Sequence, residues 1–156
     1  MSTALEKLIQ ESKLDPASCV LRHVTRTSRL LVTAFDAALS EAGLTSHQFN
    51  LLMVLARAGS MNVNSLAAAV GMHPSTTPRL IARLVEDGLI RVKSGPDRRE
   101  RLIAITRKGD ERLRRAYPCW AVVQREILHQ LGDNGWLTTI KKLKDIRTAL
   151  RTAQGS

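Results

Sequence analysis

Apolar residues recur every three or four positions along most of the chain, a spacing that places them on one face of an α-helix. Between 21 and 38 this pattern predicts a long first helix, and Gly43 supplies a left-handed residue after it. Thr45 and Gln48 have the spacing of a capping box, which predicts that a second helix begins after Thr45. We expect this second helix to end near Gly59.

Two shorter helices and a hairpin follow. The first short helix begins after Asn62 and ends at Gly71, and the second follows the segment 73–78 and continues to Glu86. The apolar period then changes from about 3.6 to about 2 residues, which predicts two β-strands. These strands are expected over 89–93 and 101–105, with a turn at 94–97.

The remainder of the chain returns to helical spacing. A long basic helix is predicted after Thr106, with Pro118 as the expected position of a break. A last helix is expected over about 133–151. The fold class is therefore mainly α, with a small β-hairpin.

Charge gives the first indication of a partner. Lys and Arg number 24 against 14 Asp and Glu, a net charge of +10, which suits a polyanion. A basic protein without such a partner is the alternative on charge alone. Aromatic residues are only 3% of the chain, too few for the stacking surfaces that bind single strands, so duplex DNA fits better than RNA.

Other classes of protein find little support. No apolar run reaches the roughly 18–20 residues of a membrane span, and the first residues lack a signal-peptide pattern, so we expect a cytoplasmic protein with no membrane partner. Two cysteines and four histidines show no ligand spacing, so no metal is expected. Because no phosphate loop or catalytic triad is visible, we expect neither an enzyme nor a cofactor.

The two short helices around Gly71 and the hairpin after them have the order of a winged helix-turn-helix. Basic residues concentrate where such a unit meets DNA. Residues 91–101 carry five Arg or Lys and two acidic residues, whereas 41–70 carry one Arg and one Glu. The second short helix is then the recognition helix, which enters the major groove.

The recognition helix offers two kinds of contact. Ser75, Thr76 and Thr77 lie at its N-terminus, where hydroxyls and free N–H groups meet phosphates or base edges. Arg79 and Arg83 are four residues apart on its polar face, and a guanidinium can read guanine O6 and N7 together. A solvated basic face is the alternative interpretation.

The hairpin supplies further cations. Asp97 and Arg99 at its tip are predicted to form an orienting pair that presents the guanidinium to a narrow groove. Lys93, Arg98 and Arg101 are expected to attract phosphates.

From about 18 to 150 the chain resembles the MarR family of winged helix-turn-helix transcriptional regulators. The segments that carry the resemblance are 44–49, 63–67, 75–80, 87–90, 97–99 and 102–106 with Gly109. Pro78 departs from the family pattern, which usually has Thr or Ser there. The resemblance implies a homodimer on a pseudo-palindromic operator, often a repressor, released by small phenolic or anionic ligands or by thiol oxidation.

This interpretation divides the chain into three regions. The first helix and the last two are apolar enough to bury a partner surface, and pairing them would place two recognition helices about 34–36 Å apart. We assign a flexible N-terminus to 1–16, a helical dimerisation region to 17–42 and 107–152, and a winged helix-turn-helix DNA-binding domain to 43–106.

Two signals are candidates for control of DNA binding. Arg22, Arg26 and Arg29 recur at helical spacing and can attract an anionic effector, although a solvated or ion-paired face is the alternative. The resemblance places the effector pocket between the dimer helices and the winged domain, where Trp120 and Gln124 are candidates to line it, with a core position as the alternative for Trp120. Cys19 lies in electropositive surroundings and is the candidate for a thiol-based redox switch, with an inert thiol as the alternative.

Two other functions remain open at this point. A non-specific architectural DNA-binding protein shares the positive charge but does not need Arg79 and Arg83 on a recognition helix. A protein–protein module that retains a winged helix has low affinity for any duplex.

Overall fold

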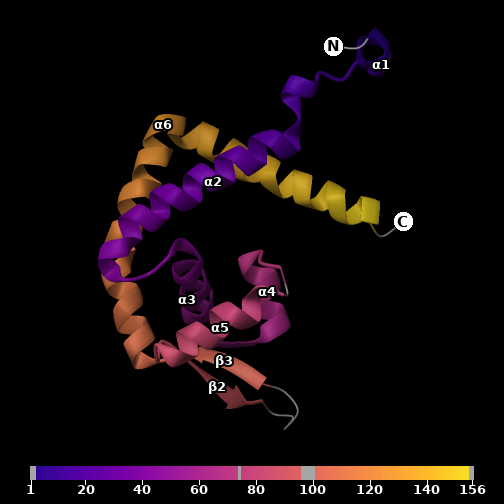
Figure 1. Ribbon diagram of the computed structural model, residues 1–156. Coiled ribbons are helices and arrows are strands. Elements are labelled where there is room, and N and C mark those ends of the chain that lie inside the picture. The colour runs from indigo at the N-terminus through magenta and orange to yellow at the C-terminus, as the bar shows by residue number, and fades with distance from the viewer. Residues whose placement is uncertain (1–2, 74, 96–100, 155–156) are drawn as a thin grey trace.

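A computed structural model of the 156-residue chain describes residues 3–73, 75–95 and 101–154 (Figure 1). The chain is mainly helical with one small sheet, as the sequence predicts. Its elements are α1 (Thr3–Ser12), α2 (Val20–Leu39), α3 (Ser46–Ala58), β1 (Ser60–Asn62), α4 (Val63–Val70), α5 (Thr77–Glu86), β2 (Ile90–Ser94), β3 (Arg101–Ile105) and α6 (Arg107–Gln154), with 3-10 turns η1 (Pro16–Ser18) and η2 (Ser40–Ala42).

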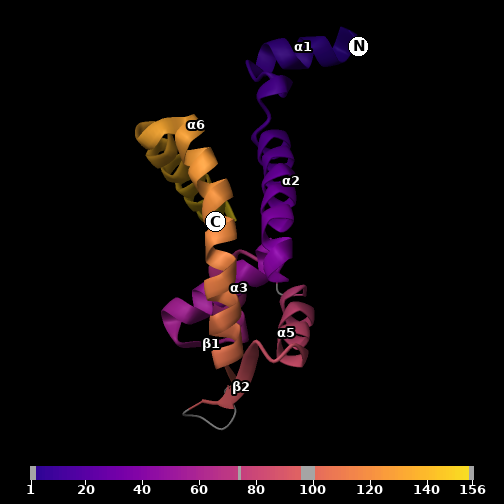
Figure 2. The ribbon, with the colours of Figure 1, turned by 90° about the vertical axis from the view of Figure 1, so that its left-hand side faces the viewer.

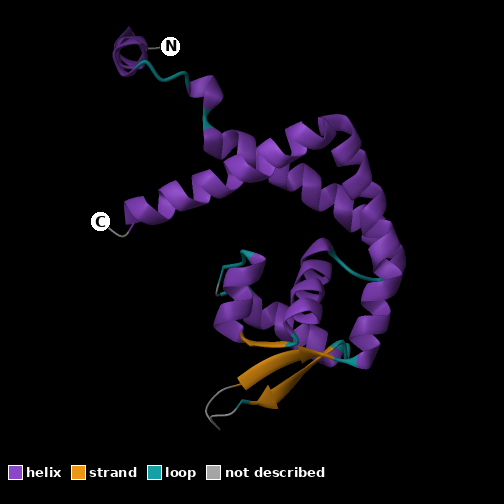
Figure 3. Ribbon diagram, turned by 180° about the vertical axis from the view of Figure 1, so that it is seen from behind, coloured by secondary structure: helices purple, strands orange, loops and turns teal. Residues whose placement is uncertain are grey.

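The elements form two parts joined by α6. α3, α4, α5 and the sheet make a compact unit, and α2 crosses α6 above it (Figure 1). α6 begins beside the sheet, passes α3, and then turns back alongside α2 (Figures 1 and 3). No helix in the described part of the chain combines the length and apolar character needed to cross a membrane.

The core lies within the compact unit. Its fully buried side chains are mainly leucines from α3, α4 and α5, closed on one side by Ile90 and Ile103 of the sheet. The sheet has three antiparallel strands in the order β1-β3-β2, rather than the two that the sequence predicts. β1 pairs Ser60 with Ala104 and Asn62 with Leu102. It was missed because three residues are too few to show an alternating pattern.

The predicted helix ends are confirmed. The Thr45 side chain accepts the Gln48 N–H, and the Gln48 side chain accepts the Thr45 N–H at 2.9 Å, which completes the capping box. Asn62 caps α4 through the Ser65 N–H at 2.8 Å. Gly43 adopts φ 67°, the left-handed conformation that glycine tolerates best.

Within the segment 1–16, which the sequence analysis assigns as a flexible N-terminus, residues 3–12 form the helix α1, and the flexibility of the segment stays a prediction. Leu5, Leu8 and Ile9 repeat at helical spacing, and Lys7 and Glu11 form an i,i+4 pair at 3.9 Å. α1 stands apart from the rest of the molecule (Figure 2).

The expected break at Pro118 is wrong. Helix α6 continues through Pro118, and the only residue inside it with non-helical angles is Gly132, at φ 64° and ψ 166°. A proline removes one backbone N–H donor, and a long helix tolerates the loss of that one hydrogen bond. A glycine, which has no Cβ, can adopt the positive φ that interrupts a helix. The last helical run therefore begins where the sequence places it, at about 133.

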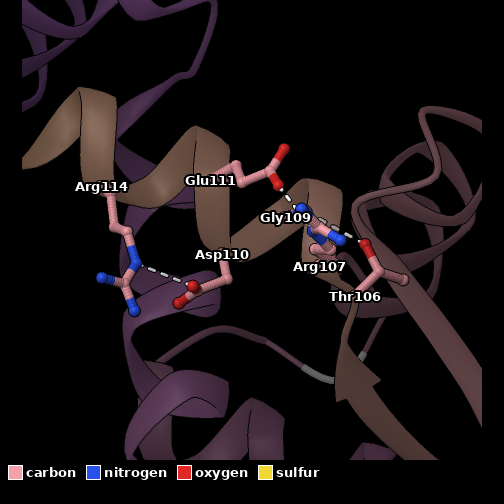
Figure 4. A network of polar contacts seen from close by, with 6 residues as sticks. All are labelled: Thr106, Arg107, Gly109, Asp110, Glu111 and Arg114. Atoms are coloured by element: carbon pink, nitrogen blue, oxygen red, sulfur yellow. Dashed lines mark hydrogen bonds and ion pairs between the residues drawn. The ribbon is translucent and has the colours of Figure 1, made fainter.

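The start of α6 is fixed to the base of the hairpin. The Leu89 carbonyl accepts the Thr106 N–H at 3.0 Å and lies 3.1 Å from the Thr106 hydroxyl, which also donates to the Gly88 carbonyl at 2.7 Å. The Gly109 N–H donates back to the Thr106 Oγ1 at 3.0 Å (Figure 4). A Cβ built on Gly109 would lie 2.0 Å from the Leu89 carbonyl oxygen, so only glycine fits.

Two exposed ion pairs continue along the same helix, Arg107 with Glu111 at 2.9 Å and Arg114 with Asp110 at 2.8 Å (Figure 4). Exposed pairs of this kind contribute little to stability. The buried contact of Gly109 with Leu89, rather than these pairs, therefore determines how α6 leaves the sheet.

We expect Gly109→Ala to lower the free energy of unfolding by about 1–3 kcal/mol, because the backbone must shift to accept the methyl group. Gly135→Ala is the matched control, since its Cβ would meet Leu131 at an ordinary 3.5 Å. That control should be neutral or stabilise the helix by up to about 1 kcal/mol. Urea unfolding checks both, and equal stability of the two variants would contradict the steric argument.

Candidate nucleic-acid interface

Helices α4 and α5 form the helix-turn-helix. α5 buries Thr77, Ile81 and Leu84 and leaves Arg79 and Arg83 exposed on the opposite side. The ion pairs found among residues 3–73, 75–95 and 101–154 lie in α1 and α6, so neither arginine is engaged in one there. Both guanidinium groups are therefore available to a partner.

The three hydroxyl residues before Arg79 differ in exposure. Ser75 and Thr76 are exposed, whereas Thr77 is fully buried and its hydroxyl donates to the His73 carbonyl at 3.2 Å. The expectation that the Thr77 side chain contacts DNA is therefore wrong, because the apolar face of α5 turns it into the core. The Ser75 Oγ lies 2.7 Å from the His73 Nδ1.

Pro78 is tolerated at the start of the helix. α5 begins at Thr77 after an N-cap at Thr76, so Pro78 lies in the first turn. Residues there have no intrahelical acceptor for their N–H, and proline costs no hydrogen bond.

The hairpin presents its cations to solvent. β2 and β3 pair in antiparallel register, with Lys93 opposite Leu102 and Ser94 opposite Arg101. Lys93 and Arg101 are exposed, and so is Arg91, a further cation that the sequence analysis did not identify as a contact. The predicted contacts Asp97, Arg98 and Arg99 lie outside the described residues.

A cavity of about 350 Å³ lies between α2, α3, α4 and α6. Trp120, a predicted ligand residue, lines it and stacks on Phe49 with ring centroids 5.7 Å apart. Sequence reasoning did not identify His47, Asn50 and Met53 as lining residues. They share one face of α3, but that face lines a cavity only where α2, α4 and α6 pack around it.

The other predicted effector residues lie elsewhere. Arg22, Arg26 and Arg29 are exposed along α2 and line a separate groove, and Gln124 is half-buried outside the cavity. The Arg22 guanidinium donates to the Pro16 carbonyl. The structure therefore does not gather these side chains around Trp120.

The cysteines are both free. Cys19 is exposed at the N-cap of α2, and Cys119 is half-buried in α6. A redox role for Cys19 stays a prediction. Within the described residues, no group of three or more His, Cys, Asp or Glu side chains could hold a metal ion.

An exposed basic face on a recognition helix, braced by α4 and followed by a basic hairpin, defines a winged helix-turn-helix DNA-binding protein. The comparisons agree. The model of the MarR family matches residues 42–100. YwoH of Bacillus subtilis, an uncharacterised HTH-type transcriptional regulator, is 24% identical over 114 residues, 73% of this chain and 83% of YwoH.

Solved structures extend the likeness to most of the chain. The Mycobacterium tuberculosis transcriptional regulator MosR, in complex with DNA, is 32% identical with a TM-score of 0.78 and covers 87% of this chain and 98% of its own. Bordetella bronchiseptica BpsR, whose DNA binding is regulated by 6-hydroxynicotinic acid, is 21% identical with a TM-score of 0.77 over 86% of this chain and 96% of its own. The chain belongs to the MarR family and is a DNA-binding transcriptional regulator.

Proposed function

We propose that this protein is a sequence-specific repressor that binds a pseudo-palindromic operator as a homodimer and is released by a small anionic aromatic ligand. The observation that carries the proposal is the exposure of Arg79 and Arg83 on the face of α5 opposite its buried side. Guanidinium groups on that face can reach base edges in the major groove. An architectural protein would need the charge but not this placement.

The proposed contacts fall into two groups. Arg79 and Arg83 read bases. The exposed hydroxyls of Ser75 and Thr76 and the cations of the hairpin contact the phosphate backbone and carry no sequence information. The proposed phosphate contacts on the hairpin are Lys93, Arg98 and Arg101. The proposed pair of Asp97 and Arg99 presents its guanidinium to a narrow groove.

Arginine and lysine variants separate these groups. Against a duplex selected from a random-sequence pool by the wild-type protein, Arg79→Ala should bind about 10–100-fold more weakly and lose base preference at one position. Lys93→Ala should weaken all duplexes alike and lower the slope of log Kd against log salt by about 1. Fluorescence anisotropy with competitor DNA measures both. If Arg79→Ala weakens all sequences equally, the architectural alternative holds instead.

The dimer proposal rests on apolar surface left uncovered in the single chain. α2 and α6 each expose large apolar side chains along their length, and grouped apolar side chains on a surface are typical of a protein–protein interface. They are Val20, Leu21, Val24, Leu30 and Leu31 on α2, and Val122, Leu131, Leu137, Leu143 and Leu150 on α6. A second copy covers this surface best, because a two-fold interface pairs the same patch on both subunits.

Sedimentation velocity tests the dimer. The wild-type protein should sediment at twice the 17.3 kDa chain mass at micromolar concentration. Leu21→Glu combined with Leu137→Glu should sediment as a monomer, because the two side chains are 75% and 66% exposed in the single chain and become buried in the dimer. Ala58→Glu, exposed at the end of α3, is the control that should remain dimeric. A monomeric wild-type protein would refute the proposal.

The ligand proposal rests on the cavity lined by Trp120. It is largely apolar and aromatic, with His47, Asn50 and Ser46 as polar groups that can orient a ring bearing a carboxylate. It lies between α2 and the helix-turn-helix, so an occupant contacts both parts of the molecule. A ligand that binds one arrangement of the two parts better than the other shifts DNA affinity.

A thermal-shift panel of salicylate, 4-hydroxybenzoate and 6-hydroxynicotinate tests the cavity. At about ten times its Kd, a ligand should raise Tm by about 3–6 °C. Met53→Phe, which narrows the cavity, should abolish the shift, whereas Arg26→Ala should leave it unchanged. The reverse result would assign the ligand to the arginine groove on α2, and no shift with any of the compounds would count against the cavity.

A further inference from the structure

His73 organises the residues that begin the recognition helix. Its backbone carbonyl accepts the N–H groups of Thr76 at 3.0 Å and Thr77 at 3.3 Å, together with the Thr77 hydroxyl. Its ring Nδ1 lies 3.3 Å from the Ser75 nitrogen, which donates to it, and 2.7 Å from the Ser75 Oγ. Every donor on residues 75–77 that has a described partner is therefore directed at His73.

The Ser75 N–H indicates which tautomer the neutral His73 imidazole adopts. A backbone N–H can only donate, so Nδ1 must carry a lone pair, and the single ring proton of neutral His73 is on Nε2. The Ser75 hydroxyl then also donates to Nδ1. In this state the hydroxyl hydrogen is directed inward and cannot be donated to DNA.

Protonation reverses this arrangement. When Nδ1 gains a proton it becomes a donor, and the Ser75 Oγ becomes its acceptor. The hydroxyl hydrogen and the Ser75 N–H then lose their inward acceptor and can point to a phosphate oxygen. The imidazolium adds a positive charge beside the N-terminus of α5, where an anion is already favoured.

We propose that His73 is a positioning residue through which proton uptake strengthens DNA binding, by releasing the Ser75 donors to a phosphate. The inference rests on the proposed function, because it needs a phosphate at the start of α5. It assigns to His73 a role that the sequence did not indicate. The one signal in the sequence is the spacing of His73 and Ser75, two residues apart before a helix.

The charged surroundings give the coupling its sign. α4 carries no titratable residue, and α5 carries Arg79, Arg83 and Glu86. His73 itself is exposed and makes no ion pair with any residue in the described ranges. A phosphate bound beside His73 attracts the imidazolium, so DNA binding and protonation of His73 assist each other.

Affinity at two pH values tests the coupling. With the duplex selected by the wild-type protein and at constant ionic strength, binding should be about 3–10-fold tighter at about pH 6 than at about pH 8. His73→Asn should bind like the wild type at about pH 8 and show no change with pH. An asparagine Oδ1 can accept the Ser75 N–H in place of Nδ1, but it does not titrate.

A variant of Ser75 separates the effect of the His73 charge from the effect of the Ser75 hydroxyl. Ser75→Ala keeps the imidazolium and removes the hydroxyl, so it should retain only part of the pH dependence. If His73→Asn keeps the full pH dependence, the effect belongs to another group and the inference is wrong. If the wild-type protein binds its duplex specifically but equally at both pH values, the inference also fails, while the proposed function stands. If it binds no duplex specifically, both fail.

A measurement on the unmodified protein supplies an independent check. Nitrogen-15 NMR of the imidazole at about pH 8, without DNA, should show the proton of His73 on Nε2, with Nδ1 as the acceptor. A proton on Nδ1 would overturn the inference even if the His73→Asn variant failed to fold.

Discussion

The contact between Gly109 and the Leu89 carbonyl is the constraint on which the arrangement of the molecule depends. The carbonyl accepts the Thr106 N–H, and a Cβ at position 109 would lie 2.0 Å from its oxygen. α6 can start here only because a glycine allows the backbone to approach. From there α6 passes α3 and crosses α2 (Figure 1). This one close approach therefore helps to fix the position of the recognition helix α5 relative to the apolar faces of α2 and α6 that we propose to pair between subunits.

Helix α5 contributes both to the stability of the core and to the proposed recognition of DNA. Its ten residues place Ile81 and Leu84 in the core and leave Arg79 and Arg83 on the opposite face. Burial of the two apolar side chains therefore also determines that the two guanidinium groups face solvent. The start of α5 is held by the hydrogen bonds of His73, and proton uptake by that ring would change which donors face a phosphate. The segment from His73 to the end of α5 therefore contributes to stability and to the proposed recognition of DNA.

Much of the fold could be predicted from local signals. The capping box at Thr45, the cap at Asn62 and the left-handed Gly43 need only neighbouring residues, and all three are confirmed. The errors have physical causes. Pro118 removes one hydrogen bond without ending α6, because the rest of the helix continues to bond around it. Thr77 is polar in the sequence but lies on the apolar face of α5, and only its register shows that its hydroxyl is buried.

The sequence by itself determined the class of this protein, because helical period, caps and the concentration of cations around the hairpin are properties of neighbouring residues. The tertiary structure decided which side chains come together. It joined β1 to the hairpin across some forty residues of chain. It also placed Trp120 in the lining of the same cavity as His47 and Asn50, while Arg22 lines a different groove. Contacts between residues distant in sequence depend on how helices pack, and no local pattern along the chain contains that information.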